Sequence, residues 1–214
     1  MPAPLAAPAV TDYWDDACRH LVRRDRVMKK LIPKFGEARL QSRGDAFTTL
    51  ARSIVGQQVS VKSAQAVWGR VTALADSAAD DPLVPGAVLA RAVEELRGAG
   101  LSARKVEYLT DLARHFHDGT VHVAQWRDMD DEAIIEELVA IRGIGRWTAE
   151  MVLIFQLGRQ DVLPVGDLGV QKGFQKLFKL RGLPSAERMV KLAKPFRPYR
   201  SVASWYMWRV NEAG

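Results

Sequence analysis

The sequence contains one cysteine, Cys18, among 214 residues. A single cysteine excludes a disulfide framework, a cysteine zinc site and a four-cysteine iron–sulfur cluster. The histidines are scattered and do not repeat a metal-ligand spacing; they are His20, His115, His117 and His122. We therefore expect no metal site built from side chains.

Long apolar runs are also missing. No segment approaches the roughly 20 apolar residues that span a bilayer, so we expect no association with a membrane. The first residues are rich in Ala and Pro and lack the basic region that opens a signal peptide. Residues 1–11 are therefore predicted to form a disordered tail, and the cytoplasm is the default location.

Apolar residues recur at helical spacing along nearly the whole chain. After a candidate N-cap at Asp45, for example, Phe47, Leu50, Ala51 and Ile54 lie on one helical face. The same reasoning places helices after Ser60 and Ser102, one helix over 86–97, and the last helices from about Leu168, Ser185 and Ser201. Only residues 120–123 alternate as in a strand, which is too short for a sheet. We predict an all-α protein of about ten helices.

Two glycines, Gly143 and Gly145, separate two helical segments, and the second segment is expected to begin near Arg146. Glycine adopts positive φ and lets a ligand approach the backbone closely. The free N–H groups and positive dipole end of the second helix suit a phosphate. A tight helix–helix turn without a ligand explains the same glycines. A dinucleotide fingerprint fits poorly, because the third glycine is missing and a helix precedes the loop.

A carboxylate follows this loop at Asp167, which ends the segment Leu-Pro-Val-Gly-Asp over 163–167. Directly before Leu168, Asp167 fits the N-cap of the next helix. Behind a candidate phosphate site it also fits an acid with a catalytic role. The two roles can coexist in one side chain.

Positive charge is concentrated near this carboxylate. The formal net charge is +6 and the isoelectric point about 9.6, which favours an anionic partner. Nine Lys or Arg and one acid, Glu187, lie over 168–200. Such a face can simply be solvated, but its place after a candidate phosphate site favours a nucleic acid.

Four motifs in order give the chain a resemblance to a known family. They are the hairpin over 138–149, the segment ending at Asp167, Ile-Val-Gly-Gln-Gln-Val-Ser over 54–60, and Arg-Pro-Tyr-Arg-Ser over 197–201 leading into Trp-Tyr-Met-Trp-Arg over 205–209. The chain resembles the helix-hairpin-helix (HhH-GPD) DNA glycosylase superfamily. It is most similar to the alkylated-base enzymes of the 3-methyladenine DNA glycosylase II type, which are hydrolases.

This resemblance implies a two-lobed helical bundle with a cleft between the lobes. Within a glycosylase unit over 12–214, one lobe would comprise about 12–38 plus 167–214. The other lobe would comprise about 39–166 and contain the hairpin. The family flips a damaged base out of the duplex. Asp167 holds the place of the catalytic acid, which stabilises positive charge on the sugar and orients water.

The residue after Arg146 separates two reaction types in this family. Members that cut the strand carry a lysine there, which forms a Schiff base with the sugar. This chain has Trp147 instead. The resemblance therefore implies a monofunctional enzyme that leaves an abasic site and acts in base excision repair.

The resemblance also implies an aromatic pocket. Alkylated purines such as 3-methyladenine and 7-methylguanine are cationic, and indole faces attract cations. The pocket candidates are Trp147, Trp205, Tyr206 and Trp208. Trp205 and Trp208 share one helical face, which is equally typical of a core.

Double-stranded DNA with damaged bases is the expected partner, bound by a monomer in the cytoplasm or on the nucleoid. The Gln57–Gln58 turn would fill the gap left by the flipped base, and the hairpin would hold a phosphate. The residues expected to contact DNA are Gln57, Gln58, Gly143, Ile144, Gly145, Arg146, Thr148, Lys172 and Arg200. No cofactor is expected, apart from a monovalent cation that relatives hold on hairpin carbonyls.

Two alternatives stay open. A non-catalytic helix-hairpin-helix module that only docks on DNA would explain the glycines and the charge, although it would not need Asp167. A glycosylase with another base specificity, such as uracil or hypoxanthine, would use the same motifs.

Overall fold

The computed structural model describes residues 11–41, 44–77 and 81–212, and the side chains of 13–41, 44–77 and 81–211. Most of the tail predicted over 1–11 lies outside the described residues, and the first helix begins at Thr11. The described chain is helical and contains no strand, which confirms the all-α prediction. No helix among these residues is long and apolar enough to cross a membrane.

The chain forms two compact units, called here unit 1 and unit 2. Unit 1 comprises the described residues within Arg43–Val152, and unit 2 combines those within Ala6–Ser42 and Leu153–Gly214. The second division falls inside a helix, between Val152 and Leu153, whereas the family resemblance implied a boundary at about 166/167. The reason is that the end of this helix packs in unit 2, where Phe155 stacks on Trp208.

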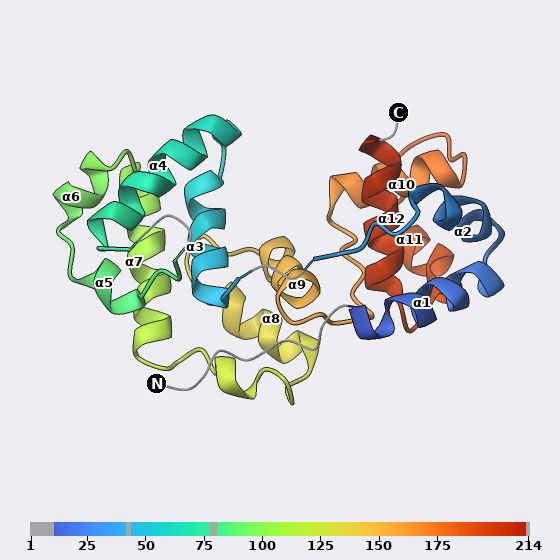
Figure 1. The fold of residues 1–214 in the computed structure, drawn as a ribbon, viewed down its shortest axis with the longest axis horizontal. Helices are drawn as coiled ribbons and strands as arrows, with labels where there is room; N and C mark the ends of the chain where they lie inside the picture. Colours follow the sequence, from blue (N-terminus) through green and yellow to red (C-terminus); the bar gives the residue numbers. More distant parts are fainter. Residues whose placement is uncertain (1–10, 42–43, 78–80, 213–214) are drawn as a thin grey trace. The chain divides into compact units, whose positions relative to one another are not determined.

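Unit 1 contains α3 (Ala46–Gly56), α4 (Val61–Leu74), α5 (Pro85–Leu89), α6 (Val93–Gly98), α7 (Ala103–His117), the 3-10 turn η2 (Val123–Gln125), α8 (Asp131–Val139) and the start of α9 (Arg146–Phe155). In this unit α7 packs against α3 and α5, and α3 packs against α4 (Figure 1). The predicted caps are confirmed, since Asp45, Ser60 and Ser102 accept hydrogen bonds from the first turns of α3, α4 and α7.

The single helix predicted over 86–97 was wrong. The chain instead forms α5 and α6, because Ala92 takes an extended conformation before α6. Glu95 Oε2 accepts a 2.7 Å hydrogen bond from the Ala92 amide, so half of a capping box holds this break. An alanine at the N-cap gives no local signal of a helix start.

Unit 2 contains α1 (Thr11–Arg24), α2 (Arg26–Leu31), η1 (Ile32–Phe35), the end of α9, α10 (Leu168–Leu177), α11 (Ala186–Leu192), η3 (Lys194–Phe196) and α12 (Arg200–Glu212). Helix α2 was not foreseen, although Asp25 caps it with bonds to the Val27 and Met28 amides. The predicted starts of the last helices are confirmed within one residue.

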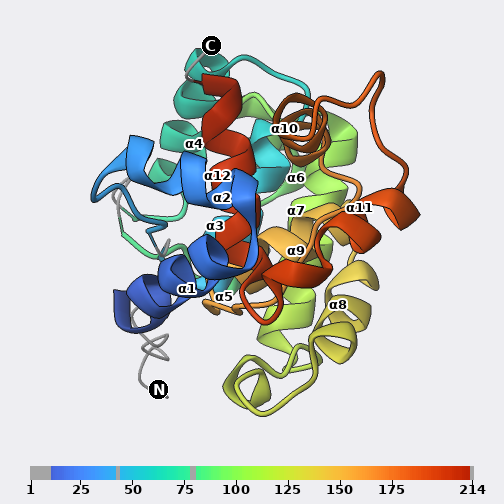
Figure 2. The same cartoon turned by 90° about the vertical axis from the view of Figure 1, so that its right-hand side faces the viewer.

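Helix α12 is the central element of unit 2 (Figure 2). One of its faces meets α10 so closely that a Cβ on Gly173 would lie 2.5 Å from Met207. Its other face meets α1, where Trp14 contacts Trp205 edge-to-face at 5.2 Å between ring centroids. Burying such aromatic side chains contributes roughly 1.5–3 kcal/mol each, so α12 anchors the unit.

Candidate functional site

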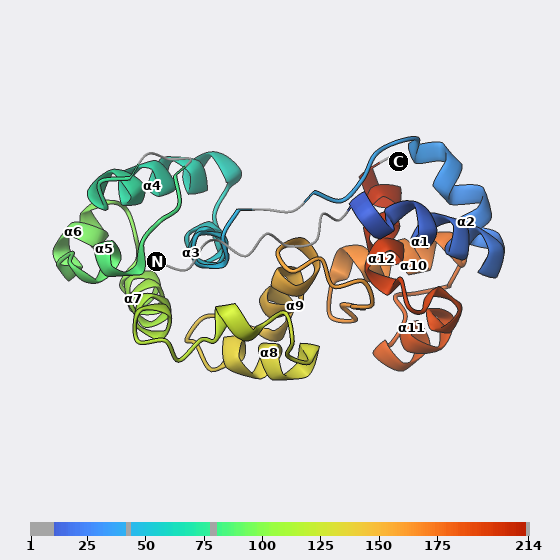
Figure 3. The ribbon, with the colours of Figure 1, turned by 60° about the horizontal axis from the view of Figure 1, so that its bottom comes forward.

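The hairpin joins α8 to α9 through the loop 140–145 (Figure 3). Gly143 has a φ of 82°, and a Cβ there would lie 2.3 Å from Tyr108 Cδ2 on α7. Both facts require glycine at this position. Around a Cβ on Gly145, in contrast, no atom lies within 4 Å. The second glycine therefore borders open space that a ligand can enter.

The hairpin groups that are suited to bind an anion are mainly backbone groups. The side chains of Ile144 and Thr148 are buried. Arg146 pairs with Glu132 at 2.5 and 2.9 Å and with Glu150 at 3.3 Å. These bonds lower the pKa of Glu132 and raise that of Arg146. Because two carboxylates engage the guanidinium, the first-turn amides of α9 are the groups best suited to an anion.

The Gln57–Gln58 turn lies next to this hairpin in unit 1. Gln57 Nε2 donates to the Gly143 carbonyl at 3.0 Å. Lys105 Nζ donates to the Val55 carbonyl at 2.7 Å, and partial burial lowers the pKa of this lysine. Gln58 is exposed and has a φ of 56°. A non-glycine residue in this region stores strain, which is common at functional sites.

Trp147 lies in the first turn of α9 and is 48% exposed. Such exposure of a large indole leaves much of its surface available for stacking. The position is consistent with the expected base contact, which stays a prediction.

Asp167 caps α10 from a buried position, with 8% of its surface exposed. Its Oδ1 accepts hydrogen bonds from the Val170 amide at 2.7 Å and from Trp208 Nε1 at 2.8 Å. Gly169 makes this approach possible, because a Cβ there would lie 2.8 Å from Trp208 Cδ1 and 3.1 Å from Asp167 Oδ1. The N-cap role is therefore observed, and the carboxylate is also fixed in orientation from a second direction.

The aromatic residues of α12 divide into two groups. Trp208 is half-buried, donates to Asp167 and stacks on Phe155 at 5.6 Å with an interplanar angle of 21°. Trp205 and Tyr206 are 3% and 1% exposed and pack against Trp14 and Phe35. The structure thus favours the core interpretation for Trp205 and Tyr206, and it gives Trp208 a contact with the candidate acid.

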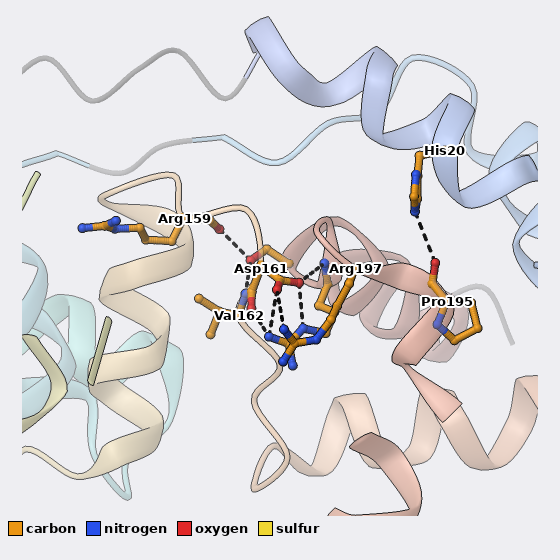
Figure 4. A network of polar contacts seen from close by, with 8 residues as sticks. His20, Arg159, Asp161, Val162, Pro195 and Arg197 are labelled. Atoms are coloured by element: carbon orange, nitrogen blue, oxygen red, sulfur yellow. Dashed lines mark hydrogen bonds and ion pairs between the residues drawn. The ribbon is translucent and has the colours of Figure 1, made fainter. Parts of the chain in front are cut away.

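The segment leading to Asp167 is braced against the start of α12 (Figure 4). Arg200 donates to both carboxylate oxygens of Asp161, at 2.7 and 2.9 Å, and to its carbonyl at 2.8 Å. Ser201 Oγ donates to the Arg159 carbonyl at 2.6 Å and accepts from the Val162 amide at 3.0 Å. Arg200 was expected to contact DNA, but its guanidinium forms an ion pair with Asp161 of the same unit.

Lys172 is exposed on α10, as a phosphate contact requires. Sequence reasoning missed the partners Tyr108, Lys105, Phe155 and Asp161. Each acts across a long sequence separation, such as the 39 residues between Asp161 and Arg200, and local periodicity carries no signal of such contacts. Within the described residues, no group of three His, Cys, Asp or Glu is placed to hold a metal ion.

Known proteins resemble the chain over most of its length. A DNA-3-methyladenine glycosylase 1 of Schizosaccharomyces pombe is 30% identical over 197 residues, which cover 90% of this chain and 86% of the relative. The structure of the 3-methyladenine DNA glycosylase Mag1 of that yeast, in complex with abasic DNA, matches with a TM-score of 0.78 and 31% identity. That match covers 92% of this chain and 97% of the other.

A DNA-3-methyladenine glycosidase from Bacillus halodurans matches with a TM-score of 0.83 and 36% identity, covering 91% of this chain and 88% of the other. The family model described as HhH-GPD superfamily base excision DNA repair protein matches residues 51–198. This span includes the Gln57–Gln58 turn, the hairpin and Asp167. The chain therefore belongs to the HhH-GPD superfamily of base excision DNA repair proteins.

Proposed function

We propose that this protein is a monofunctional DNA glycosylase that excises alkylated purines from duplex DNA, of the 3-methyladenine glycosylase II type. The observation that carries the proposal is the buried Asp167 carboxylate, held at Oδ1 by the Val170 amide and the Trp208 indole. Relatives named as 3-methyladenine glycosylases support the substrate class.

In this proposal Asp167 acts on the sugar of a flipped nucleotide. Breaking the N-glycosidic bond leaves positive charge at C1′, which a nearby carboxylate stabilises. The same group orients or deprotonates the attacking water. The hydrogen bonds from Val170 and Trp208 fix its direction before the substrate arrives, so little reorganisation is needed during the reaction.

Selectivity would come partly from the base itself. Alkylation at N3 or N7 makes the purine cationic, which weakens the glycosidic bond. Stacking on an indole such as that of Trp147 adds roughly 0.5–2 kcal/mol of cation–π attraction. A neutral, intact base receives neither contribution.

Duplex DNA would be held by the hairpin and the Gln57–Gln58 turn. A monovalent cation at the hairpin is compatible with the residues present. The carbonyls of Ile141, Gly143 and Gly145 accept bonds from Ile144 N, Gln57 Nε2 and Ala149 N. A carbonyl oxygen has two lone pairs, so these bonds leave capacity for a cation. When bound, the cation would supply positive charge beside a DNA phosphate.

The deciding experiment incubates the protein with methylated DNA and identifies the released bases by chromatography. Release of 3-methyladenine or 7-methylguanine supports the proposal. Tight binding without release would replace it with a docking module, and release only from uracil- or hypoxanthine-containing DNA would change the specificity.

A second assay tests the monofunctional character. Borohydride traps a Schiff base as a protein–DNA adduct. Because tryptophan stands at 147 where lyases carry lysine, we expect no adduct. An adduct would show a lyase activity that this proposal excludes.

A further inference from the structure

The first two helices of unit 2 carry a dense group of cations. Six exposed side chains lie over only twelve residues and form what is called here the α1–α2 basic surface: Arg23, Arg24, Arg26, Lys29, Lys30 and Lys34. The one acid among them, Asp25, uses Oδ1 to cap α2, at 2.8 and 2.9 Å from the Val27 and Met28 amides.

Neighbouring acids do not neutralise this surface. Asp15 and Asp16 on α1 pair instead with Arg39 and Arg19. Within the part of the chain that the structure describes, none of the six cations forms an ion pair. Six positive charges therefore share a small area with the one negative charge of Asp25, which leaves five of them uncompensated by side chains of this segment.

Helix dipoles explain part of this arrangement but not all of it. Arg23 and Arg24 end α1, and Lys29 and Lys30 end α2, where cations are favoured. Arg26, however, opens α2, where the dipole disfavours a cation. Lys34 lies in the last turn of the short η1 element, where a cation is again favoured. A purely local stabilising role therefore leaves Arg26 unexplained.

The surface is separate from the candidate excision residues within unit 2. Phe35 of η1 and Trp14 of α1 pack against Trp205 and Tyr206 of α12. Asp167 and Gly169 meet α12 through Trp208. Helix α12 thus lies between α1 and the Asp167 site, as Figure 2 also shows for the helices.

The charge and exposure of these side chains favour an extended polyanion as the binding partner. Among its apolar residues, Met28 and Leu31 are 0% and 5% exposed, and Val27 and Ile32 are half-buried. The surface therefore presents no row of exposed large apolar side chains that could enter a bilayer. Closely spaced cations without apolar anchors are typical of phosphate-backbone contacts.

We propose that the α1–α2 basic surface binds the phosphates of duplex DNA away from the lesion, as a second, sequence-independent contact. This inference rests on the proposed function only in taking DNA as the substrate. The contact holds lesion-free duplex on the protein and adds salt-dependent affinity, and it has no part in bond cleavage.

The test compares two double variants that remove the same charge. K29Q/K30Q acts on the α1–α2 basic surface. R97Q/R114Q removes two exposed cations of unit 1 that form no ion pair among the described residues. Binding to a lesion-free duplex several turns long is measured over roughly 50–200 mM salt. We expect the salt slope to fall by about 1–2 for K29Q/K30Q, at about 0.9 per phosphate contact, and to stay unchanged for the control.

Single-turnover base release at saturating enzyme should be equal for wild type and both variants. An unchanged slope for K29Q/K30Q would overturn the proposal, and so would an equal fall in both variants, which would reflect net charge alone. If K29Q/K30Q lost binding to phosphatidylserine vesicles but not to DNA, a lipid surface would replace DNA as partner. If K29Q/K30Q lowered the salt slope as expected but the wild-type protein released no base, the glycosylase proposal would be refuted and the proposed DNA contact would stand.

Discussion

Units 1 and 2 differ in charge as well as in the residues they carry. Unit 1 contains the hairpin and the Gln57–Gln58 turn, yet it has 12 Lys or Arg against 16 Asp or Glu. Unit 2 contains Asp167 and has 19 Lys or Arg against 9 Asp or Glu. The unit with the candidate phosphate-binding loop is therefore acidic, and the unit with the candidate catalytic acid is basic.

This difference indicates a division of work. In the proposed function, unit 1 would hold a phosphate through backbone amides at short range, because its net charge repels DNA at longer range. Even Arg146, beside the hairpin, is paired with Glu132 and Glu150. Unit 2 would supply the electrostatic attraction for DNA, and its Asp167 would act on the sugar.

Asp167→Asn should have the largest effect. Asparagine is also a good N-cap, so the fold and DNA binding should be kept. Loss of the carboxylate charge should slow base release by about a hundredfold to ten-thousandfold. Single-turnover assays and binding to lesion-bearing duplex measure the two properties. Near-normal release by the variant would remove Asp167 from the mechanism.

Gly143→Ala and Gly145→Ala separate folding from phosphate contact in unit 1. The first should destabilise the protein by about 2–4 kcal/mol, because of the positive φ and the contact with Tyr108. That corresponds to a fall of roughly 5–15 °C in melting temperature. The second should leave the melting temperature nearly unchanged and weaken DNA binding. Equal stability losses would contradict the different surroundings of the two glycines.

Trp208→Phe should slow base release without destabilising the fold. The substitution removes the indole donor to Asp167 and keeps a ring against Phe155. Because hydrogen bonds to charged groups contribute about 1.5–3 kcal/mol, base release should slow about tenfold to a hundredfold. Trp205→Phe serves as the control, since it should lower the melting temperature and leave the rate alone. If only Trp205→Phe slowed base release, Trp208 would not be the residue that positions Asp167.

Gln58→Ala should have the smallest effect. A glutamine that fills the gap in the duplex and bonds to the orphan base would contribute about three- to tenfold in affinity. Binding to lesion-bearing duplex should weaken more than binding to intact duplex. If both weaken equally, Gln58 contacts the backbone rather than the gap.

Local features of the fold could be predicted from the sequence, while long-range contacts could not. The caps at Asp45, Ser60 and Ser102 and the start of α9 at Arg146 follow from neighbouring residues. The break between α5 and α6 at Ala92 could not be predicted. Glu95 accepts a hydrogen bond from the Ala92 amide there, but alanine is not a typical N-cap residue.

The candidate site shows the same limit. The position of Asp167 before α10 is visible in the sequence, but its bond from Trp208 depends on how α12 packs against α10. Likewise, the Gln57 contact with Gly143 joins segments 86 residues apart. Arg200 was expected to meet DNA because only its charge is visible in the sequence, whereas Asp161 is its partner in the structure.

The most direct test of the division of work measures both properties on one variant from each unit. Dissociation constants for lesion-bearing duplex and single-turnover rates of base release are determined for Asp167→Asn and Gly145→Ala. We expect a crossed result, in which the unit 2 variant, Asp167→Asn, binds normally and fails to release the base. The unit 1 variant should bind weakly and release the base normally once saturated. If both variants lost binding and rate together, the two units would not have separate roles.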